Sequence, residues 1–211
     1  MAINLQKGSR INLKKLENDL SHVTIGLGWD VVEQKGLISK LFGKKEDEYD
    51  LDVIAVLLNE NGRIANPGEN LKNGDVIFYN NVIFYNNMSH PTGKVWLTGD
   101  NRTGEGEGDQ VICELEGLPE QYKRIAFVVR IYQGIKRNQQ FGAVNNAFIR
   151  AADAKGKEMV RFEISNTPEF HGKRSMIFAE LRRNGKDWEF RAIGTPFAGD
   201  SFVEILRNNY A

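Results

Sequence analysis

Short apolar runs rich in β-branched and aromatic residues recur along this chain, separated by Gly, Asn and Pro, and this rhythm constrains the fold most. Regular short strands with turn signals between them are typical of a sandwich or barrel rather than of βαβ units. The sequence therefore predicts a mainly β fold, a β-sandwich of two antiparallel sheets with few short helices. Strands are expected at residues 22–27, 51–58, 76–79, 111–115, 125–131, 147–152, 159–164, 175–182 and 188–195.

Other elements are scarce. A helix is expected at residues 201–209, and a helical turn or two near 137–144. The Asn184-Gly185 pair between two expected strands predicts a β-hairpin. No linker divides the 211 residues, so we expect a single domain over 1–211. The segment 32–48 breaks the strand rhythm and is interpreted as an exposed insertion between two strands.

The hexapeptide VIFYNN occurs twice in succession over residues 76–87. Six is an even number, so a slip by one repeat keeps every side chain on its original face of a sheet. Asn80 and Asn81 suit a two-residue type I′ turn, which would make the repeat a small hairpin. The other interpretation is a tandem duplication whose spare copy is looped out. In either case the repeat carries no chemistry.

Charge and cysteine content exclude several classes of protein. Lys plus Arg number 28 and Asp plus Glu number 28, so the overall charge indicates no particular partner. Cys113 is the single cysteine, which excludes an internal disulfide and a zinc site built from several cysteines. The N-terminus lacks the apolar region of a secretory signal, and no apolar run is long enough to span a bilayer. We expect a cytoplasmic protein without a transmembrane segment.

The stretch TGDNRTGEGEGD, residues 98–109, is the strongest candidate for a binding site. Three of its four glycines alternate with acids, so the backbone can turn several oxygens toward one centre. Hard cations need many oxygen ligands, and Ca²⁺ accepts irregular geometry. The spacing is not that of an EF-hand, and a solvated acidic turn is the alternative. The carboxylates of the stretch are Asp100, Glu105, Glu107 and Asp109.

A second acidic cluster lies in YDLDVIAVLL. Asp50 and Asp52 are two residues apart at the start of an expected strand, so both side chains project on the same face. Two neighbouring carboxylates repel each other unless a cation lies between them. The alternative is a solvated charge run that continues from KKEDE. Asp30, at the end of GLGWD, is a further candidate ligand, although a lone Asp at a turn is usually a cap.

Basic residues are concentrated between residues 121 and 152, where six of them occur without any acid. Such a block attracts anions, and its polar and aromatic neighbours would suit nucleic acid or phosphate. The preferred interpretation is that these cations pair with acidic loops of the same domain or of a neighbouring copy, so no nucleic-acid partner is expected. The six are Lys123, Arg124, Arg130, Lys136, Arg137 and Arg150.

Signals for catalysis are weak. The three histidines have no helical ligand spacing, and no P-loop, complete G-x-G-x-x-G or G-x-S-x-G motif is present. Cys113 lies in an apolar run, VICEL, which favours a core position over a nucleophile. We therefore expect no catalytic residues and no enzyme activity.

Seven segments together resemble the TerD family of tellurium-resistance and stress-response proteins. They occur in the family's order and cover essentially the whole chain: LQKGSRINL, GLGWD, YDLDVIAVLL, VIFYNN, TGDNRTGEGEGD, NQQFGAVNNAFIRAAD and DWEFRAIG. The resemblance implies a β-sandwich that binds calcium through its acidic loops and has no catalytic activity. It also implies a cytoplasmic role beside other tellurium-resistance proteins, some of them membrane-embedded.

The resemblance also implies a ligand set. Carried over by motif, the calcium ligands are Asp50, Asp52, Asp100, Asn101, Glu105, Glu107 and Asp109, with Asp30 as a weaker candidate. Two departures stand out. The family pattern has VIFYNN once, and it continues the acidic run with further acids where this chain has Gln110.

The leading hypothesis is a calcium-binding, non-enzymatic stress-response protein that belongs to a larger assembly and is implicated in tellurite resistance. One alternative is a calcium-dependent module that attaches to anionic lipid at the inner face of the membrane. The other is a metal-dependent phosphoester hydrolase that uses the clustered carboxylates.

Overall fold

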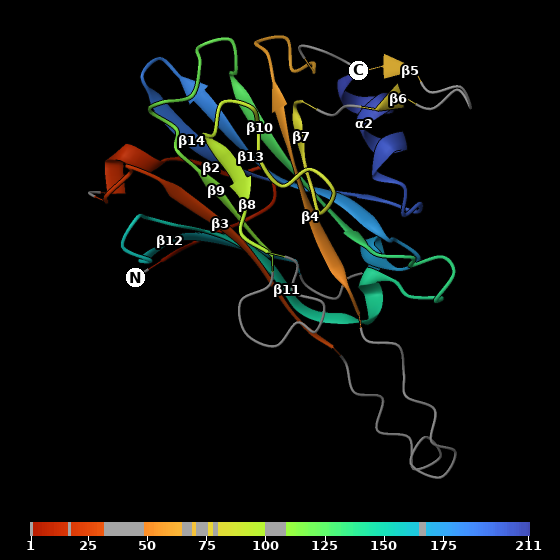
Figure 1. The fold of residues 1–211 in the computed structure, drawn as a ribbon. Helices are drawn as coiled ribbons and strands as arrows, with labels where there is room; N and C mark the ends of the chain where they lie inside the picture. Colours follow the sequence, from red (N-terminus) through yellow and green to blue (C-terminus); the bar gives the residue numbers. More distant parts are fainter. Residues whose placement is uncertain are drawn as a thin grey trace.

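The structure is a computed structural model that describes residues 2–16, 18–31, 49–64, 69–70, 76–77, 80–99, 109–164 and 168–211. In this part of the chain, two six-stranded sheets pack face to face around one large apolar core (Figure 1). Except for one parallel pair, β1 with β12, the strands of both sheets pair antiparallel. The predicted mainly β sandwich is therefore confirmed.

Sheet A has the strand order β1-β12-β11-β3-β9-β8. In that order its strands are Ile3–Leu5, Glu158–Ile164, Val144–Ala152, Val23–Val31, Gln110–Cys113 and Val95–Leu97. Sheet B has the order β2-β14-β13-β10-β4-β7. Its strands are Arg10–Asn12, Asp187–Phe197, Ser175–Asn184, Arg124–Ile131, Leu51–Leu58 and Val82–Ile83. The remaining elements are β5 (Glu69–Asn70), β6 (Val76–Ile77), α2 (Phe202–Tyr210) and 3-10 turns at Leu13–Leu16, Phe141–Ala143 and Pro168–Phe170.

Strand β4 is buried on both faces, which explains its unbroken apolar sequence. Leu51 and Val53 belong to the core between the sheets, whereas Ile54 and Val56 belong to a second cluster on the outer face of sheet B. Helix α2 covers that outer face with Ile205 and Leu206 (Figure 1). The sandwich is thus thickened on one side, over the strand that begins with the acidic cluster.

Helix α2 begins where its sequence predicts. The hydroxyl of Ser201 accepts a hydrogen bond from the backbone N–H of Glu204 at 3.4 Å, which satisfies one free donor of the first turn. Ser at the cap and Glu three residues later form the sequence pattern of a capping box. The expected helix at residues 201–209 is therefore confirmed to within one residue.

The two copies of VIFYNN have different surroundings. Val82–Ile83 of the second copy forms β7 and pairs with β4 at the edge of sheet B. Val76–Ile77 of the first copy forms β6 and pairs with β5 in a separate two-stranded ladder. Within the described residues the copies do not pair with each other. Residues 78 and 79, which would face 82 and 83 in the predicted hairpin, lie outside the described residues. The predicted insertion at 32–48 lies outside the described residues.

Strands β13 and β14 form the predicted hairpin, but its turn is displaced by one residue. Asn184 is the last residue of β13 and pairs with Asp187, so Gly185 and Lys186 make the two-residue turn. Gly185 has φ of +63°, a conformation that glycine adopts without steric cost. This turn closes the end of sheet B at which β10 begins.

Candidate functional site

Asp109 links the two sheets at the end of the acidic stretch. Its side chain is 4% exposed, and its Oδ2 accepts a hydrogen bond from the backbone N–H of Val53 in β4 at 3.4 Å. Its backbone carbonyl accepts from the N–H of Leu27 in β3 at 3.3 Å. Because β3 belongs to sheet A and β4 to sheet B, Asp109 spans the sandwich. The end of the Gly-rich stretch is thus held beside the start of β4, where Asp50 and Asp52 lie.

Asp52 lies on the outer face of sheet B, where it meets a cation of the protein itself. It is 5% exposed, and its Oδ2 accepts a hydrogen bond from Nε of Arg130 at 2.8 Å. The two residues are directly opposite each other in the pairing of β4 with β10. A cation was expected near this carboxylate, and the guanidinium of Arg130 lies there.

Aromatic rings surround the guanidinium of Arg130. Its central carbon lies 5.2 Å from the ring centroid of Phe202 in α2 and 5.4 Å from that of Tyr132. Nη1 of Arg130 also donates to the carbonyl of Asp200 at 3.5 Å, just before α2 begins. The Asp52–Arg130 pair therefore connects the acidic start of β4 with the helix that covers sheet B.

The predicted ligands divide into three groups. Asp50, Asp52 and Asp109 lie in the described part of the chain and come from neighbouring segments of the fold. The backbone of Asp30 is described as part of β3, but its side chain is not. Asp100, Asn101, Glu105 and Glu107 lie outside the described residues. Among the residues that are described, no three His, Cys, Asp or Glu side chains form a group that could hold a metal ion.

Cys113 is a core residue. It is fully buried in β9, and this burial raises the pKa of its thiol, so the reactive thiolate is disfavoured at neutral pH. His90 is also buried: its ring nitrogens lie 2.7 Å from Oγ1 of Thr92 and 3.3 Å from Oδ1 of Asn81. Burial lowers the pKa of His90, which favours a neutral ring that positions its neighbours.

Two arrangements of charge were not predicted from the sequence. Arg130, expected only as one of six basic residues, pairs with Asp52, which is 78 positions away. The Lys123–Arg124 pair lies beside the Arg182–Arg183 pair, and the four side chains line one cleft. The only sequence signal for the second arrangement is that each pair lies at the end of an expected strand.

Comparison with known proteins agrees with this architecture and with the motifs. The model of the TerD domain matches residues 1–210. The chain belongs to the TerD family. A tellurium resistance protein TerX from Serratia marcescens is 53% identical over 217 residues, which is 99% of each chain. A stress response protein, SCP2, from Bacillus subtilis is 38% identical over the full length of both.

Solved structures agree at the level of the fold. A crystal structure from Streptomyces coelicolor, described as a homologue of telluride resistance protein (TerD), superposes with a TM-score of 0.61. It covers 91% of this chain and 99% of its own, at 22% sequence identity. The two proteins therefore share the same β-sandwich fold. In the described part of this family member, no helix has the length and apolar character needed to cross a membrane.

Proposed function

We propose that this TerD-family protein binds calcium through its acidic segments and acts in tellurium resistance and stress response without catalysing a reaction. The position of Asp109 is the observation that carries the proposal. This buried carboxylate ends the Gly-rich acidic stretch and accepts a hydrogen bond from Val53, one residue after Asp52. Two acidic segments that are about 50 residues apart in sequence thus meet at one end of the sandwich.

The donor chemistry fits a hard cation. Carboxylate and amide oxygens are the ligands that Ca²⁺ prefers, and a site of six to eight oxygens needs both segments. Asp109 and Asp50 are the described residues that would anchor the ion, together with Asp100, Asn101, Glu105 and Glu107 from the Gly-rich stretch and Asp30 as a further donor. Bound calcium would supply the positive charge that lets these carboxylates lie close together.

Asp52 has a different role in this proposal. Its Oδ2 is hydrogen-bonded to Arg130, so this oxygen reaches an ion only if it leaves the guanidinium. Asp52 then either supports the site through its contact with β10 or exchanges Arg130 for calcium. Exchange would release the guanidinium that lies against Phe202 of α2. Calcium binding would in that case alter the outer face of sheet B, which α2 covers.

The proposed partners are other tellurium-resistance proteins, a membrane-embedded one among them. Relatives of this chain include several proteins with the name tellurium resistance protein, which supports a shared process. Binding of calcium to the folded state alone would stabilise that state by mass action. Calcium would also order the surface around the acidic segments, and we expect this surface to contact the partner proteins.

The decisive experiment is calorimetric titration of the chelator-stripped full chain with Ca²⁺, repeated with Mg²⁺. We expect Ca²⁺-selective heat and a higher melting temperature. The variant Asp109→Asn keeps an oxygen for the Val53 N–H but removes the charge, so we expect about tenfold weaker Ca²⁺ binding or more.

The matched control for this titration is Asp187→Asn, at the hairpin end of sheet B. This substitution makes the same change of charge at the end of sheet B opposite to Asp52, and we expect unchanged affinity. Absence of heat and of thermal stabilisation in the unmodified chain would refute the calcium proposal. If Asp109→Asn and Asp187→Asn weakened Ca²⁺ binding equally, the proposed position of the calcium site would be refuted.

A further inference from the structure

A cleft with a volume of about 250 Å³ lies at the end of sheet B where β10 begins and the β13–β14 hairpin turns. Arg124 is the first residue of β10 and Lys123 directly precedes it, whereas Arg182 and Arg183 lie near the end of β13. Strand pairing brings them together, because Arg124 lies directly opposite Arg182. The described residues that line the cleft are Glu60, Lys123, Arg124, Arg182, Arg183 and Gly185.

Arg183 is held in place by the protein. Its Nη2 donates to the carbonyl of Leu118 at 2.7 Å, and its Nε points to the carbonyl of Tyr122 at 3.4 Å. The guanidinium also lies 4.7 Å from the ring centroid of Trp188. An arginine fixed in this way loses little conformational entropy when it binds a ligand. Nη1 is the nitrogen that these contacts leave for a ligand.

Arg124 is also positioned by its surroundings. Its Nη2 donates to the carbonyl of Glu60 at 3.5 Å, and its Nη1 lies 4.0 Å from Oε2 of Glu180. Gly62 leaves space for this guanidinium, because a Cβ there would lie 3.0 Å from Nη1. Glu180 is 7% exposed and is shared with Arg191 at 3.8 Å, so it balances these two arginines beneath the cleft.

Within the described residues, the other two cations of the cleft, Lys123 and Arg182, have no ion pair with a carboxylate of the kind that Arg124 has. In the described part of the chain, the side chains of Lys123 and Arg182 make no hydrogen bond, and Arg182 contributes only a longer-range attraction to Glu180. Among the described lining residues Glu60 is the single carboxylate, and Glu120 lies near Arg183 outside the lining. Four cations that converge on one small cleft repel each other, and an anion between them removes that repulsion.

We propose that this cleft binds a small, doubly charged oxyanion. Guanidinium groups match such ligands geometrically, because their parallel N–H donors reach two oxygens at once. The ligand is either a free inorganic oxyanion or the phosphate group of a small phosphorylated metabolite. The cleft is separate from Asp52, because β10 begins at Arg124 and reaches Asp52 only through Arg130, near its opposite end. This proposal does not depend on calcium binding.

The test is titration of the full chain, in phosphate-free buffer of low ionic strength, with inorganic phosphate, tellurite and adenosine monophosphate. We expect saturable binding that weakens as salt is added. Binding of the inorganic ions alone would assign a free oxyanion as the ligand. Tighter binding of adenosine monophosphate would assign a phosphorylated metabolite. Absence of binding by all three probes would overturn the proposal.

Two variants test whether the anion binds in the cleft. Lys123→Gln with Arg182→Gln removes the two unbalanced charges and no hydrogen bond of the fold, so we expect about tenfold weaker binding or more. Glu60→Gln removes the repelling carboxylate, and we expect tighter binding. An unchanged affinity in the first variant, or a weaker affinity in the second, would contradict the proposed site.

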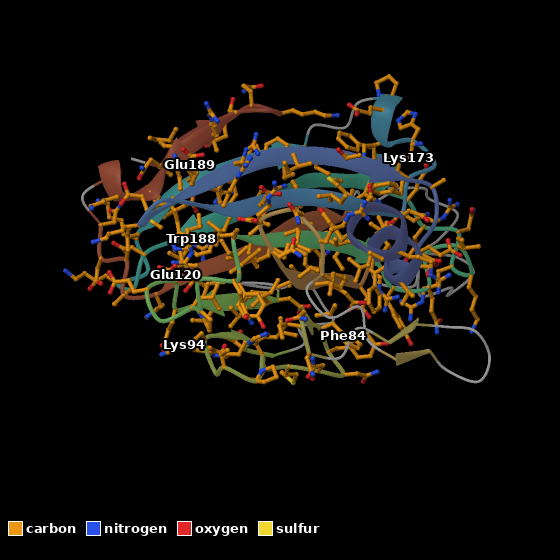
Figure 2. All side chains as sticks on the ribbon, turned by 90° about the horizontal axis from the view of Figure 1, so that it is seen from above. Phe84, Lys94, Glu120, Lys173, Trp188 and Glu189 are labelled. Carbon is orange, nitrogen blue, oxygen red and sulfur yellow. The ribbon has the colours of Figure 1, made fainter. Side chains whose placement is uncertain are left out.

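The matched control is Lys136→Gln with Lys173→Gln. Figure 2 shows Lys173 at the opposite end of the molecule from Trp188, which stacks with Arg183. Lys136 follows the far end of β10. The control changes the net charge equally, so we expect unchanged affinity. If it weakened binding as much as the cleft variant, the effect would come from overall charge and not from this cleft.

Discussion

Gly26 and Gly28 of the GLGWD motif leave space on the outer face of sheet A. A Cβ at Gly28 would lie 2.4 Å from Cζ of Phe148, and one at Gly26 would lie 3.2 Å from Nε of Arg150. Both neighbours belong to β11, which pairs with β3. The glycines therefore allow Phe148 and Arg150 to cross over β3. In this part of the motif, packing accounts for the residues without any phosphate-binding role.

We expect Gly28→Ala to lower the free energy of unfolding by about 1–3 kcal/mol, because the Phe148 ring must move. Gly26→Ala is the matched control in the same strand. It should cost less, since the side chain of Arg150 is flexible and its contact is longer. Urea unfolding of both variants measures the difference. Equal losses would contradict the crossing of Phe148 over Gly28.

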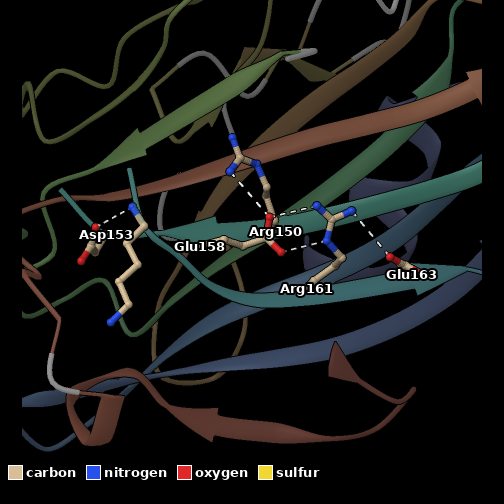
Figure 3. A network of polar contacts seen from close by, with 6 residues as sticks. Arg150, Asp153, Glu158, Arg161 and Glu163 are labelled. Atoms are coloured by element: carbon tan, nitrogen blue, oxygen red, sulfur yellow. Dashed lines mark hydrogen bonds and ion pairs between the residues drawn. The ribbon is translucent and has the colours of Figure 1, made fainter. Parts of the chain in front are cut away.

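Strands β11 and β12 are joined by a charge network centred on Glu158 (Figure 3). Nε and Nη2 of Arg161 donate to its two carboxylate oxygens at 2.8 and 2.9 Å. Nη1 of Arg150 lies 3.7 Å from Oε2. Arg150 and Arg161 are directly opposite each other in the strand pair, where like charges repel. Glu158 offsets that repulsion.

The network predicts a pH dependence of stability. The hydrogen bonds from Arg161, followed by the charges of Arg161 and Arg150, hold the pKa of Glu158 below its usual range. A carboxyl group with a lowered folded-state pKa contributes stability above its unfolded pKa of about 4.3, and this contribution is lost as the pH falls. Glu158→Gln should therefore lower stability at pH 7, and its difference from the unmodified protein should shrink toward pH 3.

Unfolding free energies at pH 7, 5 and 3 test this dependence. Glu163→Gln is the control, because Glu163 is half exposed and contacts Arg161 at 3.5 Å only. Surface pairs of that kind contribute little, so its effect should be small at every pH. A constant difference between Glu158→Gln and the unmodified protein across this range would contradict the role of the carboxylate.

At the scale of the whole molecule, the repeated hexapeptide offers an internal comparison. Ile83 of the second copy is fully buried in β7, at the edge of sheet B. Asn81, the last residue of the first copy, is also buried, and its carbonyl accepts a hydrogen bond from the N–H of Leu57 at 2.9 Å. Ile77 occupies the same place in the first copy, in a ladder outside the two main sheets. Val82–Ile83 of the second copy thus belong to sheet B, whereas Val76–Ile77 of the first copy do not.

We expect Ile83→Ala to lower the free energy of unfolding by about 2–5 kcal/mol, the usual loss for a large apolar side chain in a core. Ile77→Ala makes the same change among identical sequence neighbours and should cost less. Thermal and urea unfolding compare the two variants. A larger loss at Ile77 would mean that the first copy, and not the second, completes sheet B.

Local pattern was sufficient for much of the fold. The strand at Leu51–Leu58 has the predicted bounds because both of its faces are buried, so its apolar run ends where burial ends. Helix α2 begins as its capping residues indicate. By contrast β1, β2 and β8 were not predicted. They are three-residue strands near sheet edges, and so short a segment carries little periodicity.

The sequence by itself determined the mainly β class, the family and the acidic segments, because these depend on residue types and their local spacing. Only the tertiary structure decided which charges meet. Asp109 reaches Val53, Asp52 reaches Arg130, and Arg124 lies opposite Arg182 because of the order and register of strands that are distant in sequence. Order and register follow from burial across the whole core, and no local motif encodes them.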